Sequence, residues 1–452
     1  MKIRKLIIFC ALSASLCSWA GVEVEGSRFV SVEAPATSGL SEVLVVEDTY
    51  AASLVFTAAS ASTPVRWYSF GSAGGGYAEP IENVVYQGAT SKVSLSAEDK
   101  GFLIEENGRQ KAVWVVDYAL HYPTMTGMFI TPENDCDRVM FETNGGFDRI
   151  LYYSINGAPL ELNRGIRLEY TDLKDVTSGS QEDGDYDASW QQVTKYVEFP
   201  YISGTFSAQA PLCNTDFVLT GDRFLEMWGG MLSFSTETYL TTRVDAITWA
   251  VQESRENENE QNPSTTGLGG SAPCIITFNA VPTDAAVFTE WQFSPTEDFS
   301  DVLYRFNDSV FTFTFTEYGT TYVRFECADA SGQCMYDSDI YTVMVGESKL
   351  LCPNAFSPHN QDGVNDEWRV SYSSLVSFDC HIFNRWGKEL FSTTNPAQGW
   401  DGKVGGKFVP SGVYFYVIKA EGADGRQYNL SGDINIIGSK LRPTTEGGEE
   451  IL

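Results

Sequence analysis

The chain has 452 residues, with 30 Lys and Arg against 60 Asp and Glu, and a formal net charge of −30 at pH 7. This charge repels nucleic-acid phosphates and anionic lipid, so we expect neither as a partner. At roughly 100–150 residues per domain, the length requires several domains. Aromatic residues make up 13% of the chain and charged residues only 20%, and there are 40 glycines. This composition favours strands and turns, so the sequence predicts an all-β protein.

The first twenty residues are typical of a secretory signal peptide. Three basic residues lie among the first five, and an apolar run follows over Leu6–Leu16. Ser18 and Ala20 place small side chains where a signal peptidase requires them, so we predict cleavage between Ala20 and Gly21. The apolar run is shorter than the ~20 residues that span a bilayer. We expect no transmembrane segment once the signal peptide is removed.

Short strand signals separated by turn residues follow as far as residue 251. We predict two β-sandwich domains here, residues 21–123 and 124–251. Strands of the first are expected at Glu42–Glu47, Ser53–Thr57, Val65–Phe70 and Ala112–Tyr118. Strands of the second are expected at Arg149–Ile155, Gly165–Tyr170, Thr194–Phe199, Asp216–Leu219 and Ala246–Val251. The polar stretch Ser178–Asp187 has no apolar period and is expected to be a loop.

Residues 252–271 are acidic and polar and end in glycines, so we predict a flexible linker. A third sandwich is expected over residues 272–348. Its clearest strands are Trp291–Phe293, Val310–Phe315 and Thr321–Cys327.

The order of motifs in this third region resembles a known module. Trp291 and Phe293, then Gly319–Val323, then Gly332–Cys334 follow the pattern of the PKD-like modules of bacterial surface proteins. Gln292 differs from the Asp of that pattern. The resemblance implies an immunoglobulin-like fold, so the whole chain is expected to be a tandem array of immunoglobulin-like β-sandwich domains.

Seven cysteines follow the signal peptide, and an oxidising export compartment favours disulfides. They are Cys136, Cys213, Cys274, Cys327, Cys334, Cys352 and Cys380. Domain membership favours pairing Cys136 with Cys213 and Cys352 with Cys380, and leaves Cys274 to either Cys327 or Cys334. The odd number leaves at least one thiol free or paired between chains. With no CxxC pair and only three histidines, a zinc cluster has little support.

The strongest motifs lie between Cys352 and Ile437. In order they are Pro353–Pro358, Asp362–Trp368, Ile382–Lys388, Trp400–Gly402, Pro410–Tyr416 and Gly432–Ile437. Asp424 and Gly425 predict a tight hairpin after the β-branched and aromatic run Val413–Lys419. Asn384–Gly387 predicts a turn between two further strands. We expect a small antiparallel sandwich.

This order of motifs resembles the gliding motility-associated C-terminal domain of Bacteroidetes, which is the type B sorting domain of the type IX secretion system. The residues that carry the resemblance are Pro353, Asn354, Phe356, Asp362, Gly363, Asn365, Asp366, Asn384, Arg385, Trp386, Gly387, Trp400, Asp401, Gly402, Gly412 and Tyr414. We assign residues 349–438 to this domain and 439–452 to a tail. The resemblance implies export across both membranes to the cell surface or the outside by the type IX translocon. It also implies an outer-membrane helper of the PorP/SprF type.

One loop of this domain has the oxygen-rich spacing of a calcium site. Asn360, Asp362, Asn365 and Asp366 could supply the hard ligands that calcium prefers. The same residue types are typical of Asx turns without an ion. Apart from this structural calcium, we expect no cofactor.

No nucleophile motif surrounds any histidine, and no carboxylate pair lies in a recognisable motif, so we expect no enzyme. Trp190, Trp228, Trp386 and Trp400 are candidates for stacking on sugars. We predict an exported, adhesin-like surface protein whose first two domains bind a host protein or glycan. Two alternatives stay open, a structural component of a surface layer or gliding apparatus and a hydrolase hidden in residues 124–251.

Overall fold

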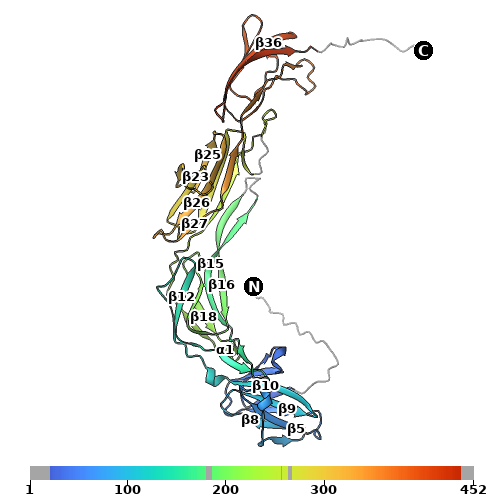
Figure 1. Cartoon of the computed structure of the whole chain (residues 1–452), viewed down its shortest axis with the longest axis vertical. Coiled ribbons are helices and arrows are strands. Elements are labelled where there is room, and N and C mark those ends of the chain that lie inside the picture. The colour runs from blue at the N-terminus through green and yellow to red at the C-terminus, as the bar shows by residue number, and fades with distance from the viewer. Residues whose placement is uncertain (1–20, 180–185, 256, 263–266, 439–452) are drawn as a thin grey trace, which may run out of the picture. The chain divides into compact units, whose positions relative to one another are not determined.

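The computed structural model describes residues 21–179, 186–255, 257–262 and 267–438 (Figure 1). Within these ranges nearly all regular structure is β, which confirms the predicted fold class. No helix in the described part of the chain is long and apolar enough to cross a membrane. The predicted signal peptide up to Ala20, the tail 439–452 and most of the predicted loop Ser178–Asp187 lie outside the described residues.

The chain divides into two compact units. Unit 1 comprises Met1–Asp172 and Val193–Leu240, and unit 2 comprises Leu173–Gln192 and Thr241–Leu452. These units are coarser than the predicted domains, and most of the predicted boundaries stay predictions.

Unit 1 begins with a sandwich of two sheets. One sheet runs in the order β1 (Val22–Glu25), β4 (Ser53–Thr57), β8 (Thr90–Ser94) and β7 (Val85–Gln87). The other runs in the order β2 (Phe29–Glu33), β3 (Glu42–Val46), β10 (Arg109–Asp117), β9 (Lys100–Glu106), β5 (Val65–Phe70) and β6 (Glu79–Pro80). Three short 3-10 helices, η1 (Ala36–Ser38), η2 (Gly75–Tyr77) and η3 (Tyr118–His121), occupy the connections. Inward-facing residues of both sheets form one core, where Trp67 meets Phe56 edge to face at 6.4 Å between ring centroids.

The second part of unit 1 holds three sheets and a short helix. The sheets are β11 (Gly127–Ile130), β12 (Arg138–Phe147) and β17 (Ile202–Gln209); β13 (Ile150–Tyr153) and β14 (Pro159–Leu162); and β16 (Asp187–Phe199), β15 (Ile166–Ser178), β18 (Val218–Gly221) and β19 (Leu232–Ser235). The helix is α1 (Arg223–Met227). Phe141, Phe147 and Phe217 are fully buried in the core of this second part of unit 1. Residues 173–192, the outer ends of β15 and β16, belong to unit 2.

Unit 2 contains a third sandwich. One sheet is β20 (Ala246–Gln252), β22 (Cys274–Pro282) and β25 (Val310–Phe315). The other is β21 (Leu268–Gly270), β28 (Tyr341–Val345), β26 (Gly319–Ala328), β23 (Phe288–Ser294) and β24 (Tyr304–Phe306), with β27 (Met335–Asp337) paired to β26. The core is aromatic, with Phe278, Trp291 and Phe293 buried together.

The pairing of β20 corrects one boundary and one element of the sequence prediction. β20 was expected as the last strand of the second sandwich, but Ala246–Gln252 pair with Ile276–Pro282 of β22. The polar residues that follow β20 are therefore a connection inside the third sandwich, between β20 and β21, and do not separate two domains. Sequence composition shows that a segment is polar, but it does not show which strand the preceding residues pair with.

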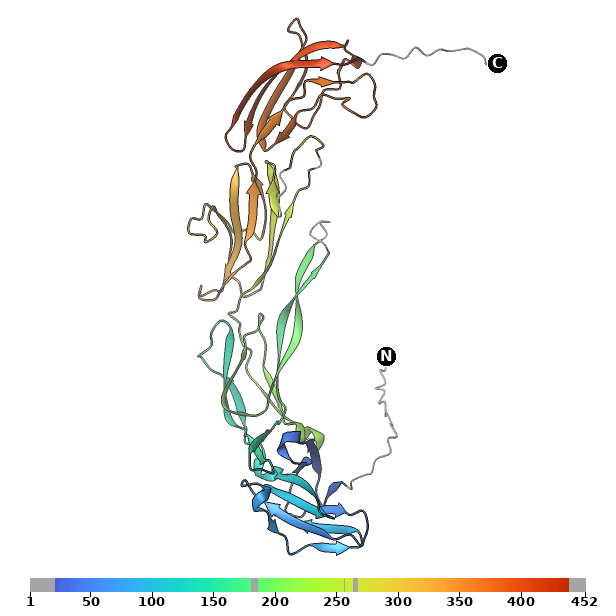
Figure 2. The ribbon, with the colours of Figure 1, turned by 45° about the vertical axis from the view of Figure 1, so that its right-hand side comes forward.

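The C-terminal part of unit 2 is built on a five-stranded sheet in the order β30 (Ala355–Phe356), β37 (Gln427–Ile436), β36 (Gly412–Gly422), β32 (Leu375–Phe383) and β33 (Glu389–Thr393). Two small ribbons accompany it, β29 (Lys349–Leu351) with β31 (Ser371–Ser373), and β34 (Lys403–Val404) with β35 (Lys407–Phe408). Figure 2 shows β36 and β37 as long, curved strands, coloured red. The predicted hairpin at Asp424 and Gly425 is confirmed, since it joins these two strands and Gly425 has a φ of +75°.

Candidate functional site

Most aromatic motif residues of the C-terminal region belong to its core. Phe356, Trp400 and Tyr414 are buried in one cluster with Trp368. The Trp368 and Trp400 backbones exchange two hydrogen bonds, at 2.9 and 3.0 Å. Trp400 is 1% exposed, and its indole N–H donates to the Lys403 carbonyl oxygen at 3.2 Å. The suggestion that Trp400 stacks on a sugar is therefore wrong, because no face of its ring is open.

The predicted turn at Asn384–Gly387 is confirmed and leaves Trp386 on the surface. The Asn384 carboxamide oxygen accepts backbone N–H bonds from Trp386 and Lys388, both at 3.0 Å. Gly387 has a φ of +78°, a backbone region that costs other residues free energy. Trp386 is 80% exposed, with the Arg385 guanidinium carbon 5.3 Å from its ring centroid.

The remaining motif residues fix loops and strand ends. The Asn354 carbonyl oxygen accepts the Asn435 backbone N–H at 2.9 Å, and the Asp401 carboxylate accepts the Lys403 N–H at 3.0 Å. The Tyr414 hydroxyl donates to the Pro410 carbonyl oxygen at 2.7 Å.

The candidate calcium loop contains an Asx turn at Asp362 and further side-chain bonds within the loop. Asp362 accepts the Val364 backbone N–H at 2.9 Å, and Asp366 accepts the Gly363 N–H at 2.8 Å. Asn360 donates its carboxamide N–H to Asp362 at 2.8 Å, and the Asn365 carbonyl oxygen accepts the Ser357 N–H. The other Asp366 oxygen, Oδ1, is buried without a hydrogen-bond partner. Across the described ranges no group of three or more His, Cys, Asp or Glu side chains is arranged to hold a metal ion.

The cysteines form none of the pairings that we expected. Cys136 and Cys334 each take part in a disulfide. Cys274, Cys327, Cys352 and Cys380 are free thiols, and the Cys213 thiol donates to the Thr171 carbonyl oxygen at 3.7 Å. Burial raises the pKa of Cys380 to about 12, with a further contribution from Cys352. Shared domain membership does not bring two Cβ atoms to the ~4 Å separation of a disulfide, and the sequence gives no measure of that separation.

Of the other tryptophans, Trp190 is hydrogen-bonded to the third sandwich, and Trp228 is hydrogen-bonded within unit 1. The Trp190 indole N–H donates to the Val281 carbonyl oxygen at 2.9 Å. Trp228 is half-buried, its carbonyl oxygen accepts an Arg28 N–H at 2.6 Å, and its own indole N–H is buried without a partner.

A buried ion pair joins the two sandwiches of unit 1. Arg164 and Asp222 have side chains that are 0% exposed, and their charged atoms are 2.8 Å apart. Arg164 also donates to the carbonyl oxygens of Asp148 and His121, both at 2.8 Å. The Tyr118 hydroxyl donates to Asp222 at 2.9 Å, and burial followed by the Asp222 charge raises the pKa of Tyr118. Because every charged atom has a partner, the pair is compatible with its dry surroundings.

Both chain segments that carry this network also carry exposed apolar side chains. Tyr118 contacts the rings of Tyr122 and Trp228, at centroid separations of 6.2 and 5.1 Å. Beside these rings in the chain, four large apolar side chains are exposed. We call Leu120, Tyr122, Met227, Trp228 and Met231 together the seam patch. Sequence analysis identified only Trp228, because the other four residues come from two segments about a hundred residues apart.

The segment predicted to be a flexible linker is hydrogen-bonded to β31 and to neighbouring loops of the C-terminal domain. Asn259 donates its carboxamide N–H groups to the carbonyl oxygens of Val370 and Pro396, both at 2.8 Å. Its carbonyl oxygen accepts the Tyr372 N–H at 3.1 Å, and Gln261 donates its N–H to Tyr372 at 2.6 Å. Composition predicted no structure here because the segment lacks apolar residues, yet polar side chains satisfy strand-edge groups as well as another strand does.

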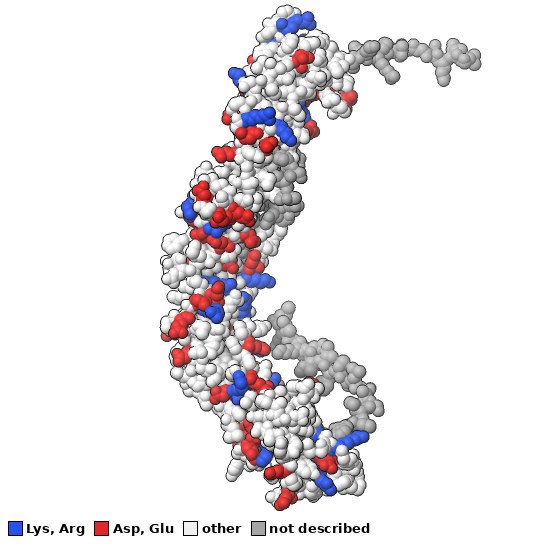
Figure 3. All heavy atoms as spheres, in the orientation of Figure 1, with Lys and Arg blue, Asp and Glu red and all other residues white. Residues whose placement is uncertain are grey.

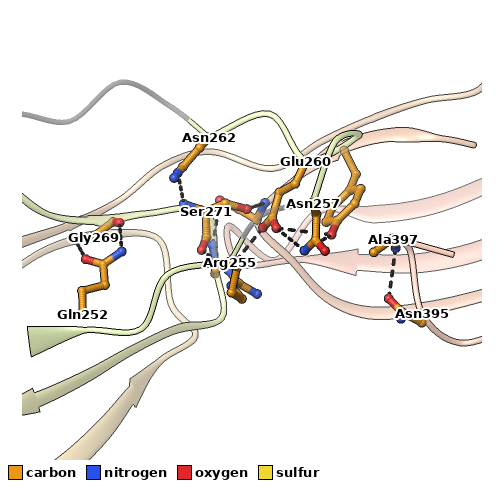
Figure 4. Close-up of polar contacts among 12 residues, drawn as sticks. Gln252, Arg255, Asn257, Glu260, Asn262, Gly269, Ser271, Asn395 and Ala397 are labelled. Carbon is orange, nitrogen blue, oxygen red and sulfur yellow. Dashed lines mark hydrogen bonds and ion pairs between the residues drawn. The ribbon is translucent and has the colours of Figure 1, made fainter. Parts of the chain in front are cut away.

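Figure 4 shows the polar network at this junction. Arg255 donates to the Ser271 carbonyl oxygen at 2.7 Å and lies 3.2 Å from the Glu260 carboxylate. Asn257 donates to the same carboxylate at 2.8 Å. An open cleft of about 420 Å³ lies beside it, lined in part by Arg255, Pro273 and Phe378. On the wall of this cleft, Arg255, Asn257 and Tyr372 all contact the Glu260 carboxylate.

The face of the described residues that is drawn in Figure 3 shows no basic patch that would suggest nucleic-acid binding. Acidic and basic residues are interspersed over the described surface drawn in Figure 3.

Three acidic residues lie side by side in the third sandwich, where Glu326 is directly opposite both Glu290 and Asp337 on neighbouring strands. Arg324 bonds to Glu326 and Asp337, and Gln292 bonds to Glu290, Glu326 and Arg324. Burial, then the Asp337 charge, raises the pKa of Glu326.

Comparison with known proteins identifies two regions. A fibronectin type III domain model matches residues 129–236, and a CHU_C type IX secretion signal domain model matches residues 350–436. No curated protein matches the chain.

Similar solved structures are tandem β-sandwich proteins. They include a tetra-tandem repeat in the extending region of a large adhesion protein, with 10% identity over 87% of this chain and 98% of that chain and a TM-score of 0.20. The fibronectin(III)-like modules of Clostridium thermocellum CbhA are also similar, with 11% identity over 45% of this chain and 100% of that chain and a TM-score of 0.17. Sidekick-1 immunoglobulin domains 1–5 have 8% identity over 92% of this chain and 81% of that chain and a TM-score of 0.24. At these TM-scores the likenesses carry no argument about function.

The matched secretion-signal model covers the five-stranded sheet and the loops held by Trp368 and Trp400. Upstream of it lie tandem β-sandwiches of the immunoglobulin and fibronectin type III kind. The chain therefore carries a type IX secretion signal domain at residues 350–436 and is exported to the cell surface or the extracellular space.

Proposed function

We propose that the exported protein is a non-enzymatic, adhesin-like binding protein that contacts its ligand through unit 1. Tandem sandwiches of the immunoglobulin and fibronectin type III kind are typical of binding or structural proteins. We further propose that a PorP/SprF-type outer-membrane helper assists its export.

The observation that carries the binding proposal is the seam patch. Tyr122, Met227 and Met231 are exposed, and Trp228, which lies between the two methionines in the chain, is half-buried. Aromatic residues and methionine are enriched in protein interfaces, and methionine adapts to irregular partner surfaces. Tyr and Trp also present flat apolar faces with a polar edge, which suits a sugar ring.

The support beneath the patch makes it a stable surface. Tyr118 is 1% exposed and contacts both Tyr122 and Trp228, and its hydroxyl is fixed by Asp222. Asp222 in turn accepts the Leu225 N–H at 3.0 Å and so caps α1, which carries Met227. A rigid support lowers the entropy that binding must overcome.

The test uses the full secreted chain, residues 21–452, with a matched pair of variants. Y122S/M227S removes two exposed members of the seam patch, whereas Y50S/Y77S removes two exposed tyrosines elsewhere in unit 1. Probes are fibronectin, fibrinogen, collagen, mucin and a glycan array. For the probe that wild type binds, we expect about a 30-fold loss of affinity in Y122S/M227S, as for a hot-spot pair, and none in Y50S/Y77S.

Equal loss in both variants would contradict a specific site at the seam patch. Failure of wild type to bind any probe, together with self-association of the chain, would favour a structural role at the cell surface. Turnover of any glycan or protein probe would contradict the non-enzymatic proposal.

A further inference from the structure

The sheet of the C-terminal domain has an apolar row on its solvent face. Val413, Phe415 and Val417 of β36 are 44%, 44% and 41% exposed, while the alternating residues Tyr414 and Ile418 are buried. An antiparallel sheet with one face on a core normally carries polar residues on the other face. Three exposed apolar side chains on a central strand are therefore not explained by folding alone.

Neighbouring strands extend this row in one direction. Phe415 lies directly opposite Phe383 on β32, and Val417 lies opposite His381. Directly opposed residues of an antiparallel pair share a face of the sheet. On the other side, β37 places Asp433 opposite Phe415. The apolar surface thus widens toward β32 and ends at a carboxylate on β37.

The exposed Trp386 continues the surface at one end of the sheet. A hollow of about 190 Å³ is lined by Trp386, Val409 and Val413, so it joins the row on β36 to the turn. We call Val413, Phe415, Val417, Phe383 and Trp386 together the outer face.

The rim of the outer face carries charges of both signs. His381 lies 3.1 Å from Asp379 and 2.9 Å from Glu389, Asp433 lies on the opposite side, and Lys419 lies directly opposite Asp379. Because the whole chain has a net charge of −30, a second copy or an anionic lipid surface would meet like charge. A protein with an apolar pocket and charges of both signs around it is complementary to this surface.

We propose that the outer face is where an outer-membrane protein of the type IX machinery binds this domain. Residues 350–436 match a secretion signal, and a signal acts by being bound by the machinery that reads it. The inference rests on the sorting role of this domain and adds the surface that the secretion machinery binds. Trp386 is the anchor, because an exposed Trp beside an Arg is the kind of residue that dominates binding energy.

The test compares two double variants of the full chain in cells that carry the type IX system. F415T/V417T removes two outer-face residues, and V404T/F408T removes a Val and a Phe of similar exposure, 38% and 37%, on the β34–β35 ribbon. Threonine is β-branched and has a high strand propensity, so both variants should fold. We expect surface display of F415T/V417T, measured by protease access to intact cells, to fall at least tenfold with folded protein in the periplasm. V404T/F408T should be displayed normally.

Binding to the purified PorP/SprF-type helper in detergent gives a second readout. We expect F415T/V417T to bind about 30-fold more weakly than wild type and V404T/F408T to bind equally well. Should F415T/V417T fail to melt cooperatively, W386A takes its place, because a side chain that is 80% exposed contributes little to folding.

Several outcomes would overturn the proposal. Normal display of F415T/V417T and W386A would show that the outer face is not read. A wild-type dimer that F415T/V417T dissociates, with display unchanged, would assign the face to a second copy, and binding to phosphatidylglycerol vesicles would assign it to lipid. Deletion of residues 350–452 distinguishes failure of the sorting role from failure of the outer-face proposal. If the truncated chain is displayed, the sorting role itself is contradicted. If the truncated chain stays in the periplasm while F415T/V417T and W386A are displayed normally, only the outer-face proposal is wrong.

Discussion

Two junctions within the molecule connect neighbouring sandwiches by different physical means. In unit 1, the junction is a buried ion pair, Arg164 with Asp222, surrounded by an apolar cluster to which both sandwiches contribute. In unit 2, the junction is a half-exposed polar segment in which Asn259 and Gln261 bond to the backbone at and beside β31 of the C-terminal domain. Sequence analysis placed a domain boundary between residues 123 and 124, close to the first junction, and predicted the segment of the second junction to be a flexible linker between the second and third sandwiches. A polar composition thus does not distinguish a linker from a segment whose hydrogen bonds are made to a neighbouring strand.

The largest expected effect is the loss of the buried charge pair. R164M leaves Asp222 buried without its ion partner and should destabilise unit 1 by about 3–5 kcal/mol. The exposed pair of Arg149 with Glu161 provides the control, and R149M should cost no more than about 1 kcal/mol. Denaturant unfolding followed by intrinsic fluorescence measures both. Equal costs would show that the seam is not a buried electrostatic junction.

A smaller effect is expected at the polar junction. N259A removes two donors at once and leaves the Val370 and Pro396 carbonyl oxygens unsatisfied, at a cost of about 1–3 kcal/mol. Hydrogen exchange at the Tyr372 amide, which donates to Asn259, should accelerate by about tenfold or more. N429A, on the exposed side of β37, should leave this exchange rate unchanged. An unchanged rate in N259A would restore the flexible-linker interpretation.

The pH dependence of the third sandwich distinguishes it from both junctions. Burial and the Asp337 charge raise the pKa of Glu326 above its ordinary value of 4.5. The folded state therefore holds this proton more tightly than the unfolded state, and the resulting stability is complete below pH 4.5 and lost as pH rises through the folded pKa. E326Q should melt a degree or more above wild type at pH 7, with the difference vanishing below pH 4.5. A constant difference across that range would contradict the assignment.

The smallest effect concerns the Asx-turn loop. D362A removes the acceptor of the Val364 N–H and should cost about 1 kcal/mol, equally with 1 mM calcium or with a chelator. Melting curves of wild type and D362A under both conditions measure this. A melting temperature of wild type that rises with calcium, and of D362A that does not, would instead establish the calcium site that the spacing suggested.

The sequence predicted local structure well where a strand's own residues determine it. β4, β5 and β25 have the predicted bounds Ser53–Thr57, Val65–Phe70 and Val310–Phe315, because β-branched and aromatic alternation is a property of the segment itself. The turn at Asn384–Gly387 was predictable for the same reason, since the Asn side chain and the positive φ of Gly387 act locally.

What depended on distant partners was not predictable. The assignment of β20 to the third sandwich requires its pairing with β22, and the role of Arg164 requires Asp222, 58 residues later. Trp400 and Trp386 have the same residue type and both belong to motifs of the sorting domain, yet one is core and the other is 80% exposed. Only tertiary packing separates them, so the seam patch and the outer face emerged from the structure alone.

The central claim is that residues 350–436 direct this chain to the cell surface, and fractionation of a truncated chain tests it most directly. Cells with an intact type IX system would express the chain with and without residues 350–452, both with the signal peptide. We expect the truncated chain in the periplasm, with unit 1 folded as judged by its protease resistance, and the full chain accessible to protease on intact cells. Surface display of the truncated chain at the level of the full chain would contradict the account.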